Sequence, residues 1–124
     1  MPFIAHADAP VFEMHNARFL GLASPQRGAQ ETAAWIVTLA PGSTGVPHQL
    51  TREEVFVALA GRAIATVGDA TFEVTPESAL VVPAHTPFSL SNPDGVPFRA
   101  VAILPVGGKA SVAGGPAFTP PWAA

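Results

Sequence analysis

A histidine and a glutamate six positions apart, His48 and Glu54, are the side chains of this sequence best suited to chemistry. A neutral imidazole accepts a proton near physiological pH, and a carboxyl group in apolar surroundings can donate one, so the two can serve as an acid–base pair. Both side chains are also ligands for divalent transition metals. The pair therefore predicts either proton-transfer catalysis or part of a metal site.

The segments around this pair have the length and composition of β-strands. Prolines (14) and glycines (11) interrupt the chain throughout and leave little room for long helices. Between them lie short segments rich in β-branched residues, bounded by turn signals, a pattern typical of an all-β sandwich or barrel. The expected strands are 11–13, 17–23, 32–39, 54–59, 62–67, 70–74, 79–82, 88–91 and 98–104.

His48 and Glu54 belong to a set of six residues whose spacing resembles that of a known protein family. A glycine, a histidine, a glutamate and a second glycine are separated by five, five and six residues, and a proline and an asparagine follow beyond a hairpin. In these positions the chain resembles the cupin family, whose two sequence motifs are separated by such a hairpin. The resemblance implies a jelly-roll barrel, also called a double-stranded β-helix, with a small molecule bound inside. The positions are Gly42, His48, Glu54, Gly61, Pro83 and Asn92.

The resemblance is incomplete where metal-binding cupins hold their ion. In those proteins two histidines and the glutamate of the first motif, with the histidine of the second, bind one metal. Carried over, His48 and Glu54 match, but Leu50 and Phe88 stand at the other two positions. Because two donors hold a divalent metal only weakly, we expect no tightly bound cofactor. The alternative is one Zn, Ni, Mn or Fe ion held by His48, Glu54 and a recruited third donor.

Two further histidines are candidates for that third donor. His85 falls in the turn before the strand that contains Phe88, so its side chain is expected near the mouth of the barrel. His15 could enter from the N-terminal strand, although nothing in its spacing requires it.

The same two substitutions predict an apolar pocket with one acid and one imidazole. Strand alternation places Glu54, Phe56 and Ala58 on one face, and the resemblance makes that face the interior one. Burial would raise the pKa of Glu54, and a nearby His48 would oppose that shift. Besides His48 and Glu54, the residues expected in the pocket are Trp35, Leu50, Phe56, His85, Phe88 and Asn92.

Composition narrows the classes of protein that fit. The net charge is −3 with six scattered basic residues, which argues against nucleic-acid binding. The absence of cysteine excludes disulfides and thiolate metal sites. No secretory signal and no membrane-spanning run is evident, so we expect a cytoplasmic protein. Hydrophobic residues make up 48% and charged residues 12%, which predicts a homodimer that covers apolar surface.

We expect one barrel domain over 1–124, with a core at about 30–106 and a Gly/Pro-rich tail at 107–124. Phe118 and Trp122 indicate that the tail is docked, either on its own barrel or across a dimer partner, rather than free in water.

Three functions fit these expectations. The first is a metal-free cupin enzyme of small-metabolite metabolism, an isomerase, cyclase or lyase, in which His48 and Glu54 exchange protons with the substrate. The second is a metal-dependent cupin oxygenase or isomerase, and the third is a sensor or carrier that binds a small molecule without changing it. One fold hosts many activities, so the resemblance alone does not choose among them.

Overall fold

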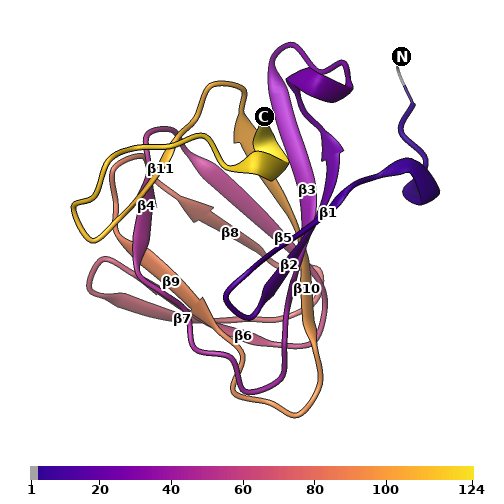
Figure 1. The fold of residues 1–124 in the computed structure, drawn as a ribbon. Coiled ribbons are helices and arrows are strands. Elements are labelled where there is room, and N and C mark those ends of the chain that lie inside the picture. Colours follow the sequence, from indigo (N-terminus) through magenta and orange to yellow (C-terminus); the bar gives the residue numbers. More distant parts are fainter. Residues whose placement is uncertain (1–2) are drawn as a thin grey trace.

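Two facing antiparallel β-sheets make up the fold in the computed structural model, which describes residues 3–124 (Figure 1). The six-stranded sheet has the order β1 (Val11–Met14), β2 (Ala17–Ala23), β3 (Thr32–Leu39), β10 (Phe98–Pro105), β5 (Glu54–Ala60) and β8 (Ala79–Val82). The five-stranded sheet has the order β11 (Ala110–Val112), β4 (His48–Leu50), β9 (Phe88–Ser91), β6 (Ala63–Val67) and β7 (Ala70–Val74). Three single-turn 3₁₀ helices complete the described elements: η1 (His6–Asp8), η2 (Pro25–Arg27) and η3 (Pro121–Ala123). This arrangement confirms the predicted all-β jelly-roll barrel.

Alternating burial along the central strands defines the interior. In β3 every second residue from Ala33 to Leu39 is buried, and β10 alternates in the same way from Phe98 to Leu104. In β5 the buried residues are Glu54, Phe56 and Ala58, as strand alternation predicts. Apolar side chains of both sheets line the interior, and Glu54 is the only charged residue buried there among residues 3–124.

Two short strands were not among the expected ones. β4 and β11 have three residues each, and they pair with one another at one side of the five-stranded sheet. β4 also pairs with β9 through His48 and Phe88, which places the histidine inside the sheet rather than in a loop. β11 lies at the sheet edge, where glycine and proline on either side are tolerated.

The C-terminal tail lies against the barrel of its own chain, across one end of the two sheets (Figure 1). Trp122 is buried, and its ring stacks on Phe19 with a centroid separation of 3.6 Å and an interplanar angle of 2°. Arg27 donates hydrogen bonds from Nε to the Leu22 carbonyl and from a terminal nitrogen to the Trp122 carbonyl, at 2.8 and 3.1 Å. The tail is therefore held in cis by an aromatic stack and an arginine bridge.

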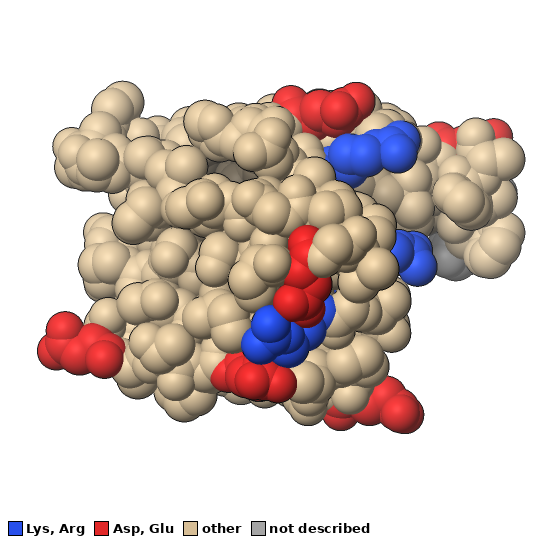
Figure 2. Space-filling view, turned by 90° about the horizontal axis from the view of Figure 1, so that it is seen from below, with Lys and Arg blue, Asp and Glu red and all other residues tan. Residues whose placement is uncertain are grey.

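Most of the face shown in Figure 2 is uncharged, and acidic and basic side chains lie next to one another near its centre and near its upper edge. Among the described residues, Arg62 is the only basic residue that forms salt bridges. It pairs with Asp94 at 2.7 Å and with Glu73 at 3.5 Å. Within the described residues no helix combines the length and the hydropathy that crossing a membrane requires.

Candidate functional site

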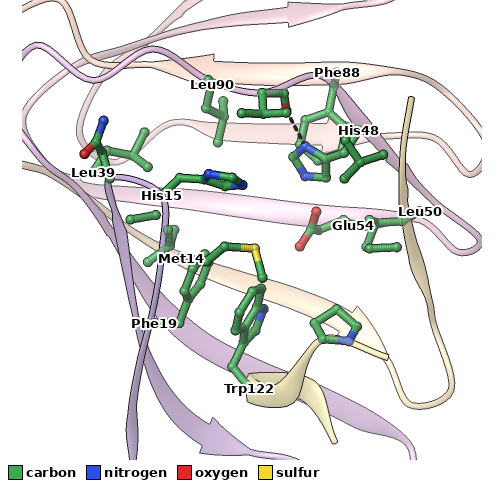
Figure 3. A pocket seen from close by; sticks show the side chains of 18 of the residues that line it. Met14, His15, Phe19, Leu39, His48, Leu50, Glu54, Phe88, Leu90 and Trp122 are labelled. Carbon is green, nitrogen blue, oxygen red and sulfur yellow. Dashed lines mark hydrogen bonds between the residues drawn. The ribbon is translucent and has the colours of Figure 1, made fainter. Parts of the chain in front are cut away.

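A cavity of about 160 Å³ lies between the two sheets, closed on one side by the C-terminal tail. Its volume is similar to the roughly 150 Å³ of an engineered apolar cavity that holds benzene. Figure 3 shows side chains from both sheets directed into it. Its wall comprises Met14, His15, Asn16, Ala17, Phe19, Trp35, Val37, Leu39, Ser43, Thr44, Gly45, Val46, His48, Leu50, Glu54, Phe56, Phe88, Leu90, Ala110, Val112, Phe118, Pro120 and Trp122.

His48 is fixed in one tautomer by its surroundings. Its Nδ1 lies 2.9 Å from the carbonyl oxygen of Val46, and since a carbonyl only accepts, Nδ1 carries the hydrogen. The ring of Phe88, the cross-strand partner, lies 4.3 Å away between centroids. Burial lowers the pKa of His48, although the hydrogen bond to Val46 partly offsets this. At neutral pH the imidazole is therefore uncharged, with an unprotonated Nε2 available as a base.

Glu54 begins β5 and points into the cavity with only 3% of its surface exposed. No described residue donates a hydrogen bond to its carboxyl group, and the side chains nearest along the wall are mostly apolar. Burial raises the pKa of Glu54 from 4.5 to about 8. The carboxyl group is therefore protonated at neutral pH and can act as an acid. We expected His48 to oppose the rise in the pKa of Glu54. It does not, because the imidazole is itself uncharged.

Figure 3 shows the Glu54 carboxyl group close to the imidazole of His48, with both side chains directed into the cavity. No hydrogen bond joins them, so each keeps a free site for a ligand atom between them. An uncharged acid opposite an uncharged base is the arrangement required to protonate one atom of a substrate while removing a proton from another.

The raised pKa of Glu54 predicts how stability depends on pH. The folded state keeps a proton that the unfolded chain releases above pH 4.5, so stability falls as the pH rises towards about 8. The loss across this interval is on the order of 4 kcal/mol. Glu54→Gln carries no charge at any pH, and we expect it to unfold at a higher urea concentration than the parent at pH 8.

Urea titrations at pH 5.5 and 8 would measure this effect. The neighbouring Glu53 is exposed, so Glu53→Gln is the matched control and should leave the difference unchanged. His48 acts in the opposite direction below pH 6.5, but it is present in all three proteins and cancels in the comparison. Equal pH dependence in the parent and Glu54→Gln would show that Glu54 is ionised in the folded state.

The donor set does not fit a tightly bound metal ion. No group of three or more His, Asp or Glu side chains among residues 3–124 is arranged to hold one. Leu50 and Phe88 are both buried and line the cavity beside His48, so apolar atoms occupy the two positions that the resemblance assigns to further donors. His85 does not line the cavity and cannot serve as the third donor there. His15 does line it, but it forms no three-donor group with His48 and Glu54 among the described residues.

The structure places Trp35, Leu50, Phe56 and Phe88 on the cavity wall with His48 and Glu54. It also brings in residues that the sequence did not indicate. Met14 and Phe19 come from the β1–β2 hairpin, and Phe118, Pro120 and Trp122 come from the tail. The two tail aromatics were recognisable as docked from the sequence, but their position over the cavity depends on the pairing of β11 with β4.

The prediction that Asn92 lines the pocket is wrong. Asn92 is absent from the cavity wall, and its hydrogen bonds show a different role. It is fully buried beneath the turn that precedes β10. Its side-chain nitrogen donates to the carbonyls of Leu39 and Val96, at 3.2 and 2.8 Å, and its side-chain oxygen accepts from the Asp94 amide at 3.0 Å. Asn92 therefore stabilises a turn by satisfying buried backbone groups.

His85 is also outside the cavity. It lies in the turn between β8 and β9, with φ of 59°, and its side chain is exposed. Its backbone amide donates to the Leu50 carbonyl at 2.7 Å, which fixes the turn rather than the imidazole.

Comparison with protein families gives a match to the cupin domain over residues 35–104. This segment runs from β3 to β10 and includes His48, Glu54 and Phe88. Comparison with the curated proteins found no match.

Solved structures with the same fold have several activities. The polyketide cyclase RemF from Streptomyces resistomycificus has a TM-score of 0.80 at 18% identity, over 98% of this chain and 88% of that one. KdgF from a Halomonas species has a TM-score of 0.71 at 16% identity, over 83% and 93%. A sugar phosphate isomerase of the cupin superfamily from Silicibacter pomeroyi has a TM-score of 0.67 at 15% identity, over 81% and 67%. At these identities the likeness establishes the fold alone.

Proposed function

The chain belongs to the cupin family, and we propose that it is a metal-free enzyme that moves protons on an apolar carbonyl compound. The observation that carries the proposal is the Glu54 carboxyl group, buried in an apolar cavity without a hydrogen-bond partner among the described residues, opposite the free Nε2 of His48. A buried polar group without a partner is costly unless a ligand satisfies it.

The wall of the cavity favours an uncharged, flat substrate. Six aromatic side chains line it, and no Lys or Arg does, so an anionic ligand such as a phosphate would find no counter-charge. This argues against an activity like that of the sugar phosphate isomerase. The volume limits the enclosed part of the substrate to about one ring.

In the proposed reaction Glu54 binds the substrate carbonyl oxygen and His48 acts on the neighbouring carbon. Glu54 gives its proton to the oxygen, while Nε2 of His48 takes a proton from the α-carbon, and the substrate becomes an enol. In a conjugated substrate the enol then regains a proton from His48 at another carbon, and Glu54 recovers its proton from the oxygen. Alternatively the enol carbon attacks a second carbonyl of the same molecule, His48 gives its proton to the oxygen of that carbonyl, and Glu54 recovers its proton from the first oxygen. These outcomes correspond to isomerisation and cyclisation respectively.

Exchange of α-hydrogens with solvent tests the proposal without knowledge of the natural substrate. We expect the protein to accelerate incorporation of deuterium into the methyl group of acetophenone in D₂O, followed by NMR. Binding of acetophenone without any acceleration would favour a carrier or sensor instead. Exchange that is lost on chelator treatment and restored by a divalent metal would favour the metal-dependent alternative.

The proposal includes a cytoplasmic location, as expected from the sequence.

A second proposal concerns the outer face of the six-stranded sheet, which we infer to be covered by a second copy of the chain. Cross-strand partners form an outward-facing apolar row through Leu20, Ile36, Val101 and Val57. Together with the low content of charged residues, 12%, such a face favours a self-complementary apolar interface.

We expect a dimer in sedimentation equilibrium at micromolar concentration. Val101→Lys, at the centre of the apolar row, should convert it to monomer because two lysines would meet near the symmetry axis. Thr66→Lys, on an exposed position of the five-stranded sheet, is the control and should remain dimeric. A monomeric parent chain would exclude this interface.

A further inference from the structure

His15 lies at the tip of the β1–β2 hairpin and lines the same cavity as His48 and Glu54. Figure 3 shows its imidazole directed into the cavity, towards the space between those two side chains. It thus reaches the cavity from the hairpin, whereas His48 and Glu54 reach it from the strands β4 and β5. A ligand held between His48 and Glu54 would extend towards His15.

The backbone at the hairpin tip is arranged so that the imidazole points inward. His15 has φ of 56°, in the left-handed region that a two-residue hairpin turn requires and that histidine adopts more often than most residues other than glycine. In a regular strand the neighbours Met14 and His15 would point to opposite faces, but both line the cavity. The Ala40 amide donates to the Asn16 carbonyl at 3.0 Å and ties the tip to the end of β3.

No structural role accounts for the imidazole. The His15 side chain is exposed rather than part of the core, and no hydrogen bond joins it to another described residue. Glycine at this position would relieve the unfavourable φ without loss of any contact that holds the hairpin.

We propose that His15 binds a second oxygen of the substrate, a hydroxyl group at the end of the molecule opposite to the reacting carbonyl. This inference rests on the proposed function and narrows its substrate to a flat hydroxyketone. The hydroxyl is uncharged, because the wall of the cavity offers no Lys or Arg to balance an anion. His15 is thus a positioning residue that orients the ring while His48 and Glu54 act on the carbonyl side.

Two ketones that differ by one hydroxyl group test the subsite. NMR titrations would give the dissociation constants of acetophenone and 4-hydroxyacetophenone. We expect the parent to bind the hydroxylated ketone about 3- to 10-fold more tightly, the range that one hydrogen bond gives. His15→Gly should abolish this preference, and His15→Asn should retain most of it, since asparagine tolerates the same φ and still forms hydrogen bonds. His6→Gly, at an exposed histidine outside the cavity, is the matched control.

The outcomes separate this inference from the proposed function. An equal preference in the parent and His15→Gly, or no preference in the parent, overturns the subsite. In Glu54→Gln the preference should persist, because the hydroxyl group binds at the other end of the cavity. A preference that depends on His15 in a protein that does not exchange α-hydrogens would leave the subsite standing and remove the enzymatic proposal.

Discussion

Glu54→Gln is expected to slow α-hydrogen exchange of acetophenone by about 10²- to 10⁴-fold, the contribution typical of a positioned acid or base. The amide keeps the shape of the buried side chain but has no proton of comparable acidity to give to the carbonyl oxygen. Since the pKa of Glu54 is about 8, exchange by the parent should also fall as the pH rises past this value. NMR detection of deuterium incorporation at pH 6 to 9 measures both effects.

Two controls distinguish a chemical effect from unfolding. Glu53→Gln changes the adjacent, exposed glutamate in the same way and should exchange at the parental rate. Glu54→Gln itself should be the more stable protein at pH 8, so a lower rate cannot be ascribed to loss of the fold. His48→Gln should cause a loss of similar size, and the double variant should be little worse than either single one, because the two groups act as a unit. Parental exchange in Glu54→Gln would remove the carboxyl group from the mechanism.

We expect the double variant Leu50→His, Phe88→His to bind a divalent metal ion more tightly than the parent does. Leu50 lies two residues beyond His48 on β4, and Phe88 is the cross-strand partner of His48 on β9, so both positions share its face. All three line the cavity with Glu54. The change raises the number of donors from two to four, the number typical of closed zinc sites.

Metal analysis of protein purified without chelators would test this directly. The double variant should carry close to one equivalent of zinc, nickel or manganese, and the parent well under one. Loss of the buried Phe88 ring should cost on the order of 3 kcal/mol of stability without metal, and added metal should restore much of it. His48→Ala in the double variant is the control and should bind weakly again. One equivalent in the parent, lost in His48→Ala, would show that the wild-type site is a metal centre.

Strand periodicity and turn residues were sufficient to predict most of the fold. All nine expected strands, from 11–13 to 98–104, match observed strands to within a residue at each end, because each has enough residues for alternation or turn signals to be evident. β4 and β11 could not be predicted in this way. Three residues carry too little periodicity, and these strands exist because they pair with each other across the intervening residues 51–109.

The central pair of the site, His48 and Glu54, could also be predicted from the sequence. The resemblance to the cupin family implied that His48 and Glu54 lie together, and it identified the face that alternation assigns to Glu54 and Phe56 as the interior one. The same resemblance identified Leu50 and Phe88 as apolar residues at positions of metal donors. Residue type and position along a strand fix these features, since a strand imposes the direction of every side chain.

The rest of the site depends on contacts between distant segments. His15 reaches the cavity through a left-handed turn, and Trp122 covers it by stacking on Phe19, more than a hundred residues away. Asn92 and His85 were placed in the pocket by motif position, yet hydrogen bonds fix them in turns outside it. The Asn92 side chain donates to the Leu39 carbonyl, and the His85 backbone amide donates to the Leu50 carbonyl. Local sequence sets which face of a strand is buried, but only tertiary packing determines which loops and tail residues close the space between the sheets.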